Sequence, residues 1–229
     1  MYKQDICILA LSARRGGGVT YIKNLILYSD ANIRSRIILI ANQELVKFAR
    51  MHGVHAITPK LPSENVLLRF VWELLVLPKV LSKAAPKFVF CPGGLIPIRA
   101  FGAWKTVTMF RNMIPFDAVQ KRKWPLGLMR LRNWLLKWLM SRSMKTADGV
   151  IFISKFARSV IIDQCKIPIK NDIIIYHGVG ENFNSSTGIT SKSKYGTDYI
   201  LYPSIIDVYK SQKEVIAAYK LLNDKVGSG

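Results

Sequence analysis

The stretch ICILALSARRGGGVTYIKNLILY, residues 6–28, decides the fold class of this 229-residue chain. It starts with a short apolar run at residues 6–11, passes through a glycine-rich turn and continues as an apolar helical pattern at residues 19–28. The apolar run is too short for a signal peptide and ends in arginines and glycines instead of a cleavage site. It predicts a first β-strand followed directly by a helix.

The same alternation continues along the chain. Further strands are predicted at residues 36–40, 54–57, 88–90, 106–110, 150–153 and 173–176, and helices at residues 44–51, 64–81, 126–144 and 155–164. The strands are apolar enough to be covered on both faces, which is typical of a parallel sheet wrapped by helices. We therefore expect an α/β fold in which residues 1–177 form one doubly wound, Rossmann-like domain.

The chain changes character after this domain. Residues 178–198 are rich in Gly, Ser, Thr and Asn and lack periodicity, which indicates an interdomain linker. Beyond it, residues 199–203 predict a strand and residues 213–222 a helix. Because one strand–helix unit cannot bury both its faces, we expect residues 199–229 to be the start of an incomplete second domain.

Basic charge is concentrated in one region. The formal net charge is +20, and residues 74–147 contain fourteen basic residues and a single acidic one, Asp117. Such an excess indicates an anionic partner, which is nucleic acid, a phosphate-bearing substrate or acidic lipid. The sequence has no helix-turn-helix, zinc-finger or RNP-like pattern. Nucleic-acid binding is therefore only a minor alternative, and nucleic acid is not an expected partner.

The predicted helix at residues 126–144 favours an anionic membrane surface. It is apolar on most sides, carries only basic charge, and follows a basic segment that ends in a tryptophan. The residues expected to contact the membrane are Lys121, Arg122, Lys123, Trp124, Trp134 and Trp138. The alternative is a core helix buried by its neighbours; in either case Leu128, Leu131, Leu135 and Leu139 are placed to face the sheet. The most apolar stretch, residues 66–81, is too charged to span a bilayer, so any contact is peripheral.

Several other classes of site are disfavoured. The three cysteines form no C-x-x-C pair and the three histidines lack further ligands nearby, so neither a disulfide framework nor a metal site is predicted. A reducing, cytoplasmic compartment fits this cysteine usage. No serine is flanked by glycines as hydrolase chemistry of the G-x-S-x-G type requires.

Gly16, Gly17 and Gly18 lie between the first strand and its helix. Glycines allow a backbone to approach a ligand closely, and the N-terminus of the helix attracts anions, so this loop predicts a phosphate site. The glycines are consecutive and no G-K-[ST] follows, which disfavours a nicotinamide or ATP site. The alternative is that they only allow a tight turn.

Arg111 and Asn112 follow the predicted strand at residues 106–110. Ligands bind beyond the carboxyl ends of strands in open α/β sheets, so these side chains are candidates for holding a charged and a hydroxylated group. The alternative is an ordinary loop, with Asn112 satisfying turn hydrogen bonds and Pro115 fixing the exit.

Five segments in this order resemble the retaining glycosyltransferases of family 4, which have the GT-B fold. They are the glycine-rich loop, residues 111–116, residues 147–154 with Phe156, His177-Gly178-Val179 with Phe183, and residues 200–204 leading to Lys210. The resemblance covers the N-terminal domain, the linker and the first unit of the C-terminal domain. It implies transfer of a sugar from a nucleotide sugar to an acceptor, often a lipid-linked saccharide in cell-envelope polysaccharide synthesis, with no cofactor besides the donor substrate.

The resemblance also implies roles for individual residues. Gly16, Gly17 and Gly18 would approach the donor diphosphate or sugar, Lys210 would neutralise the diphosphate, and Arg111 and Asn112 would line the acceptor side. Many members have His-Asp where this chain has Arg111-Asn112, and an Arg where it has Ile205 or Ile206. The paired glutamates that hold the donor belong to the part of the family's C-terminal domain that is missing here, so no catalytic residue is assigned.

Together these features predict the acceptor-binding part of a glycosyltransferase, truncated and weakly active or inactive alone. We expect it on the inner face of a membrane, with a nucleotide sugar, a lipid-linked or saccharide acceptor and anionic lipid as partners. A non-catalytic module that binds lipid or saccharide is the alternative.

Overall fold

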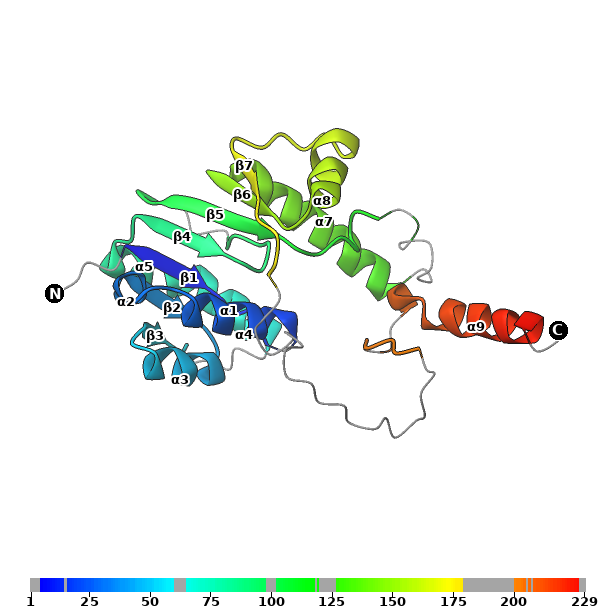
Figure 1. Ribbon diagram of the computed structural model, residues 1–229. Coiled ribbons are helices and arrows are strands. Elements are labelled where there is room, and N and C mark those ends of the chain that lie inside the picture. Colours follow the sequence, from blue (N-terminus) through cyan, green and yellow to red (C-terminus); the bar gives the residue numbers. More distant parts are fainter. Residues whose placement is uncertain are drawn as a thin grey trace.

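The computed structural model describes residues 5–14, 16–59, 65–97, 102–117, 119, 127–178, 200–204, 206 and 208–226. Its centre is a seven-stranded sheet in the order β3-β2-β1-β4-β5-β6-β7, with every pair of neighbours parallel (Figure 1). The strands are β1 (Ile6–Leu9), β2 (Ile37–Ile40), β3 (His55–Ile57), β4 (Phe88–Cys91), β5 (Lys105–Phe110), β6 (Gly149–Phe152) and β7 (Asp172–Ile174). The predicted α/β fold with a parallel, Rossmann-like sheet is confirmed.

Strand β1 occupies the point where the order of the strands reverses. Ile8 pairs with Leu39 of β2 on one side and with Phe90 of β4 on the other. The chain adds β2 and β3 in one direction, crosses back, and then adds β4 to β7 in the other. Ligands of open α/β sheets bind beyond the carboxyl ends of the strands at such a reversal, which places the loops after β1, β4 and β5 at the expected position.

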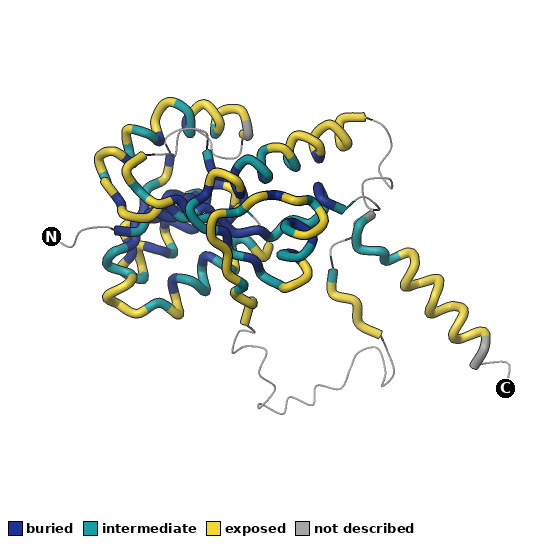
Figure 2. Tube along the Cα trace, turned by 90° about the horizontal axis from the view of Figure 1, so that it is seen from above, coloured by how far each residue is buried: buried dark blue, intermediate teal, exposed yellow. Residues whose placement is uncertain are grey.

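Helices cover both faces of the sheet. They are α1 (Gly17–Leu27), α2 (Ala31–Ser35), α3 (Gln43–Met51), α4 (Val66–Leu75), α5 (Leu77–Ala84), α7 (Leu128–Thr146) and α8 (Lys155–Ser159), which continues as the π-helical turn η1 (Val160–Gln164). Because side chains alternate along a strand, Ile8 and Ala10 join a core with α1 and α3, whereas Cys7 and Leu9 join a core with α4, α5, α7 and α8. Figure 2 shows these buried residues gathered at the sheet.

The single helix predicted at residues 64–81 is two helices. α4 ends at Leu75, and α5 begins at Leu77 with Pro78 in its first turn. A proline has no backbone N–H to donate and its ring collides with the carbonyl four residues earlier, so one continuous helix could not pass through Pro78.

Helix α7 turns a different side to the sheet than the sequence predicts. Its buried residues are Asn133, Met140, Ser143 and Met144. Leu128, Leu131 and Leu135 are 84%, 59% and 45% exposed, so the prediction that they face the sheet is wrong. Since apolar and basic residues are mixed around α7, its sequence periodicity does not define one inward face.

The described residues after position 199 form one helix, α9 (Gln212–Val226), preceded by the 3-10 turn η3 (Val208–Lys210). The helix agrees with the prediction at residues 213–222, and it is exposed over residues 213–224 (Figure 2). Residues 200–204 form no strand, so the strand predicted at residues 199–203 is wrong over that described part. Among the described helices, none is long and apolar enough to cross a membrane.

Candidate functional site

The glycine-rich loop after β1 leads directly into α1. Gly16 caps the helix with a φ of 61° and a ψ of −145°, a conformation that essentially only glycine adopts. A Cβ on Gly17 would lie 3.5 Å from Arg111 Nη2, and a Cβ on Gly18 would lie 3.5 Å from Ala13; both are ordinary contacts. The turn itself therefore requires glycine only at Gly16.

The N-terminus of α1 is suited to an anion. Within the described residues, no side chain caps it and no acidic residue lies in its first turn. The amides of Val19 and Thr20 donate to the Gly16 carbonyl, which leaves those of Gly17 and Gly18 as the groups that a ligand can reach. These amides lie at the positive end of the helix dipole, where a phosphate binds favourably.

Arg111, the first residue after β5, joins its loop to the glycine-rich loop. Its Nη2 donates a hydrogen bond to the Gly17 carbonyl at 3.0 Å, and its guanidinium lies over the Tyr21 ring at 5.2 Å from the ring centroid. Partial burial lowers the pKa of Arg111 from its ordinary value, but arginine stays charged at any physiological pH. The structure thus places a cation beside the first turn of α1.

His177 completes this cluster from the segment after β7. Its ring packs edge-on against Tyr21, with 5.5 Å between the ring centroids. Burial, and then the charge of Arg111, lower the pKa of His177 below its ordinary 6.5. We call Gly17, Tyr21, Arg111 and His177 the carboxyl-edge cluster. Neither Tyr21 nor His177 was predicted from the sequence to belong to a site, and His177 is only part of a motif that resembles the family.

Asn112 and Lys210 make local contacts. Asn112 Oδ1 accepts a hydrogen bond from the Ile114 amide at 3.2 Å, as the turn interpretation of this loop predicts. Lys210 Nζ lies 4.9 Å from the centroid of the Tyr209 ring, and the Lys210 carbonyl accepts a hydrogen bond from the Tyr202 hydroxyl. None of these contacts joins Asn112 or Lys210 to the carboxyl-edge cluster.

Of the predicted membrane residues, only the two tryptophans of α7 are described. Trp134 is 62% exposed and Trp138 is 53% exposed. Lys121, Arg122, Lys123 and Trp124 lie outside the described residues. The alternative in which α7 is a core helix covered by neighbours on two sides does not agree with this exposure.

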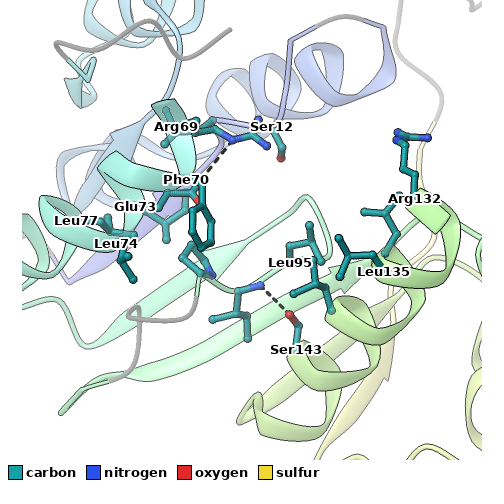
Figure 3. Close-up of a pocket in the computed structure, with 16 residues that line it drawn as sticks. Ser12, Arg69, Phe70, Glu73, Leu74, Leu77, Leu95, Arg132, Leu135 and Ser143 are labelled. Atoms are coloured by element: carbon teal, nitrogen blue, oxygen red, sulfur yellow. Dashed lines mark hydrogen bonds and ion pairs between the residues drawn. The ribbon is translucent and has the colours of Figure 1, made fainter. Parts of the chain in front are cut away.

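A cavity of about 450 Å³ lies between α4 and α7, next to the residues that precede the glycine-rich loop (Figure 3). Leucines from β1, α4, α5, α7 and the loops after β1 and β4 form half of its lining residues, and Ser12, Arg69 and Arg132 lie along its upper side in the figure. Arg69 and Glu73 form an ion pair across 3.6 Å in the wall. Burial raises the pKa of Glu73 and lowers that of Arg69.

Among the described side chains, no group of three or more His, Cys, Asp or Glu residues could hold a metal ion. Cys7 and Cys91 are free and buried between the sheet and its helices, and burial raises the pKa of the Cys7 thiol to about 12. A thiol with so high a pKa is a packing group, not a nucleophile.

The sequence matches the model of one protein family, Glycosyltransferase Family 4, over residues 15–182. This range holds the glycine-rich loop, Arg111 and His177. The chain belongs to glycosyltransferase family 4. The predicted family is thereby confirmed, although residues 200–204 and Lys210 lie beyond the matched range.

Two solved structures are similar to this family 4 chain. The Anabaena protein HepE, solved in complex with UDP and glucose, is 16% identical and gives a TM-score of 0.51, with 78% of this chain and 46% of HepE covered. A glycosyltransferase from Rickettsia africae ESF-5 is 16% identical with a TM-score of 0.45, and 78% of this chain and 44% of that protein are covered. The family 4 chain thus spans less than half the length of either protein. No curated protein sequence matches it.

Proposed function

We propose that this chain is the acceptor-binding part of a retaining glycosyltransferase that uses a nucleotide sugar, and that the carboxyl-edge cluster holds the donor diphosphate. The observation that carries the proposal is the hydrogen bond from Arg111 to the Gly17 carbonyl. It brings a guanidinium next to the first amides of α1, so a cation and helix N–H groups converge on one point.

The chemistry of sugar transfer needs such a point. When the bond between sugar and diphosphate breaks, negative charge develops on the leaving nucleoside diphosphate. Preorganised N–H groups and a fixed cation stabilise that charge where water is excluded. HepE was solved with UDP and glucose, which supports a nucleotide sugar as the donor for this family 4 chain.

The cluster changes the role proposed for Arg111. The resemblance assigned Arg111 and Asn112 to the acceptor side, whereas the contact with Gly17 supports a place for Arg111 beside the diphosphate. Asn112 stays a proposed acceptor residue, since its Nδ2 donors are suited to a sugar hydroxyl. Lys210 stays a proposed second cation for the diphosphate.

The proposal also includes the domain organisation of the chain and its location at a membrane. We assign residues 1–177 to the acceptor domain, 178–198 to a linker, and 199–229 to the start of a donor domain, with no cofactor besides the donor.

The acceptor is a lipid-linked saccharide of cell-envelope polysaccharide synthesis, reached at the inner face of an anionic membrane. The exposed Trp134 and Trp138 and the purely basic charge of α7 support this location. Transfer by this polypeptide alone is weak or absent.

Calorimetric titration with UDP, GDP and uridine tests the diphosphate site. We expect both diphosphates to bind and uridine to bind at least tenfold more weakly. Arg111→Gln should weaken diphosphate binding about tenfold, because a hydrogen bond to a charged group contributes about 1.5–3 kcal/mol. Lys47→Gln, which removes an exposed cation from α3, is the matched control and should bind as the unchanged chain does. Equal binding of uridine and UDP, or no effect of Arg111→Gln, would refute the site.

A further inference from the structure

The cavity between α4 and α7 has the size and the apolar lining of a small-molecule site. Its volume of about 450 Å³ lies within the roughly 300–1,000 Å³ of small-molecule sites. Leu77 is completely buried at its wall, whereas Phe70 and Leu135 line it and are 48% and 45% exposed. The apolar wall therefore runs from the core of the domain out to solvent, as the entry of a long flexible chain requires.

The apolar surface continues from the cavity to the tryptophans of α7. Residues 132, 136, 139 and 143 line the cavity at steps of three and four, and residue 135 lies beside them, so they form one stripe along the helix. Each residue turns the helix by about 100°, so Leu131 and Trp138 lie on the neighbouring stripe, on the side away from the sheet. Both are more than half exposed. A chain in the cavity would thus enter from the face proposed to rest on the membrane.

Cations lie where the head of such a molecule would emerge. Arg132 lines the cavity and is exposed. Arg69 also lines the cavity, where it is paired with Glu73. α7 carries no acidic side chain along its whole length. We call the end of the cavity that carries Arg132 and Arg69 its rim. The rim therefore suits an anionic head group.

The rim also adjoins the proposed diphosphate site. Leu11 and Ser12 are part of the cavity wall, and the glycine-rich loop begins four residues after Ser12. Ser12 packs against the loop after β4, since a Cβ on Gly93 would collide with the Ser12 hydroxyl at 2.3 Å. A head group held at the rim would project along the carboxyl edge of the sheet toward Gly16.

We propose that this cavity binds the hydrocarbon chain of the acceptor lipid, with its phosphate at Arg132 and its saccharide directed toward the glycine-rich loop. The assignment rests on the proposed function and gives its acceptor a chemical class: a single-chain or prenyl-type lipid phosphate that is drawn part-way out of the bilayer for transfer.

Decyl phosphate, titrated below its micelle concentration, is the probe. We expect saturable one-to-one binding in calorimetry. Leu136→Trp fills the cavity and should weaken binding at least tenfold, and Leu95→Trp, from the opposite wall, should do the same if the first variant melts early in circular dichroism. Arg132→Gln should weaken decyl phosphate several-fold and leave the uncharged decyl glucoside unchanged. Phe156→Ala, which removes an exposed aromatic ring from α8 and not from the cavity wall, is the matched control and should bind decyl phosphate normally.

The outcomes separate this inference from the proposed function. Absence of saturable binding, or unchanged binding by both cavity-filling variants, overturns the inference. UDP is titrated into the same preparations. Loss of decyl phosphate binding with intact UDP binding refutes the lipid site alone, and the reverse result supports the lipid site while refuting the proposed diphosphate site.

Discussion

At the scale of single residues, Gly16 has the most demanding backbone of the glycine-rich loop. Its φ of 61° with a ψ of −145° is strained for any side chain, although a Cβ would meet no neighbouring atom. We expect Gly16→Ala to lower the free energy of unfolding by about 1–3 kcal/mol, because such strain costs that much per residue. Urea unfolding followed by circular dichroism measures the change.

Gly18→Ala is the matched control for this prediction. Gly18 lies in the first turn of α1, its added Cβ would make an ordinary contact with Ala13, and alanine favours a helix more than glycine does. This variant should be as stable as the unchanged chain or slightly more stable. Equal destabilisation by both variants would show that crowding, and not backbone strain, explains the glycines.

The pKa of His177 reports on the carboxyl-edge cluster in solution. Burial and the nearby charge of Arg111 both favour the neutral ring, so the folded chain takes up a proton at His177 only below pH 6.5. Arg111→Gln removes the positive charge, and the pKa should rise toward 6.5 while the part due to burial remains. An NMR pH titration of the His177 ring measures this shift. The same titration should not move in Lys47→Gln, and an unchanged pKa in Arg111→Gln would place Arg111 away from His177.

The sequence predicted two members of the carboxyl-edge cluster but not the contact between them. Gly17 and Arg111 were both identified, because each follows a strand whose carboxyl end must lie at one edge of a parallel sheet. Arg111 and Gly17 are 94 residues apart, and their contact depends on the side-chain direction of Arg111 over Tyr21. Neither spacing nor composition carries that direction, and Tyr21 belongs to an apolar helical pattern typical of core residues. Asn112 was weighed equally between a ligand and a turn role, and its contact with Ile114 supports the turn.

At the scale of elements, α7 is the helix whose exposed face needs an explanation. Trp134 and Trp138 are exposed beside basic residues, and burying a large apolar side chain contributes about 1.5–3 kcal/mol. We expect Trp134→Ala with Trp138→Ala to lower partition onto vesicles that contain anionic phospholipid at least tenfold in co-sedimentation. The binding should also weaken in high salt, since α7 carries only positive charge.

Phe156→Ala is the control for the tryptophan pair. Phe156 lies on α8 and is 68% exposed, so its replacement removes an exposed aromatic ring from another surface. It should leave vesicle binding unchanged. If the tryptophan pair also leaves it unchanged, α7 does not contact the membrane.

Sequence periodicity predicted the strands but not the orientation of α7 on the sheet. All seven strands were predicted to within a few residues, since short Ile- and Val-rich runs between polar turns have few other interpretations. Pro78 was visible in the sequence and should have divided the helix at residues 64–81. The side of α7 that faces the sheet could not be predicted from the sequence, because Leu128 and Leu131 are as apolar as Met140 and Met144. Only the packed structure distinguishes the two sides.

At the scale of the whole molecule, two features adjoin one edge of the sheet. The carboxyl-edge cluster lies beyond β1 and β5, and the cavity between α4 and α7 reaches the same edge through Leu11 and Ser12. In our account a lipid chain occupies the cavity, its phosphate lies at the basic rim, and the donor diphosphate lies at the first turn of α1. Arg111 and Arg132, both from the basic region between positions 74 and 147, would each hold one of these anions.

The most direct test is an NMR titration of the backbone amides with UDP, compared with uridine. The account predicts that UDP shifts the Gly17 and Gly18 amides and the His177 ring in a saturable way, that uridine does not, and that Arg111→Gln weakens the response about tenfold. UDP-induced shifts that leave Gly17 and Gly18 unmoved would contradict the diphosphate site, and with it the central claim about this family 4 chain.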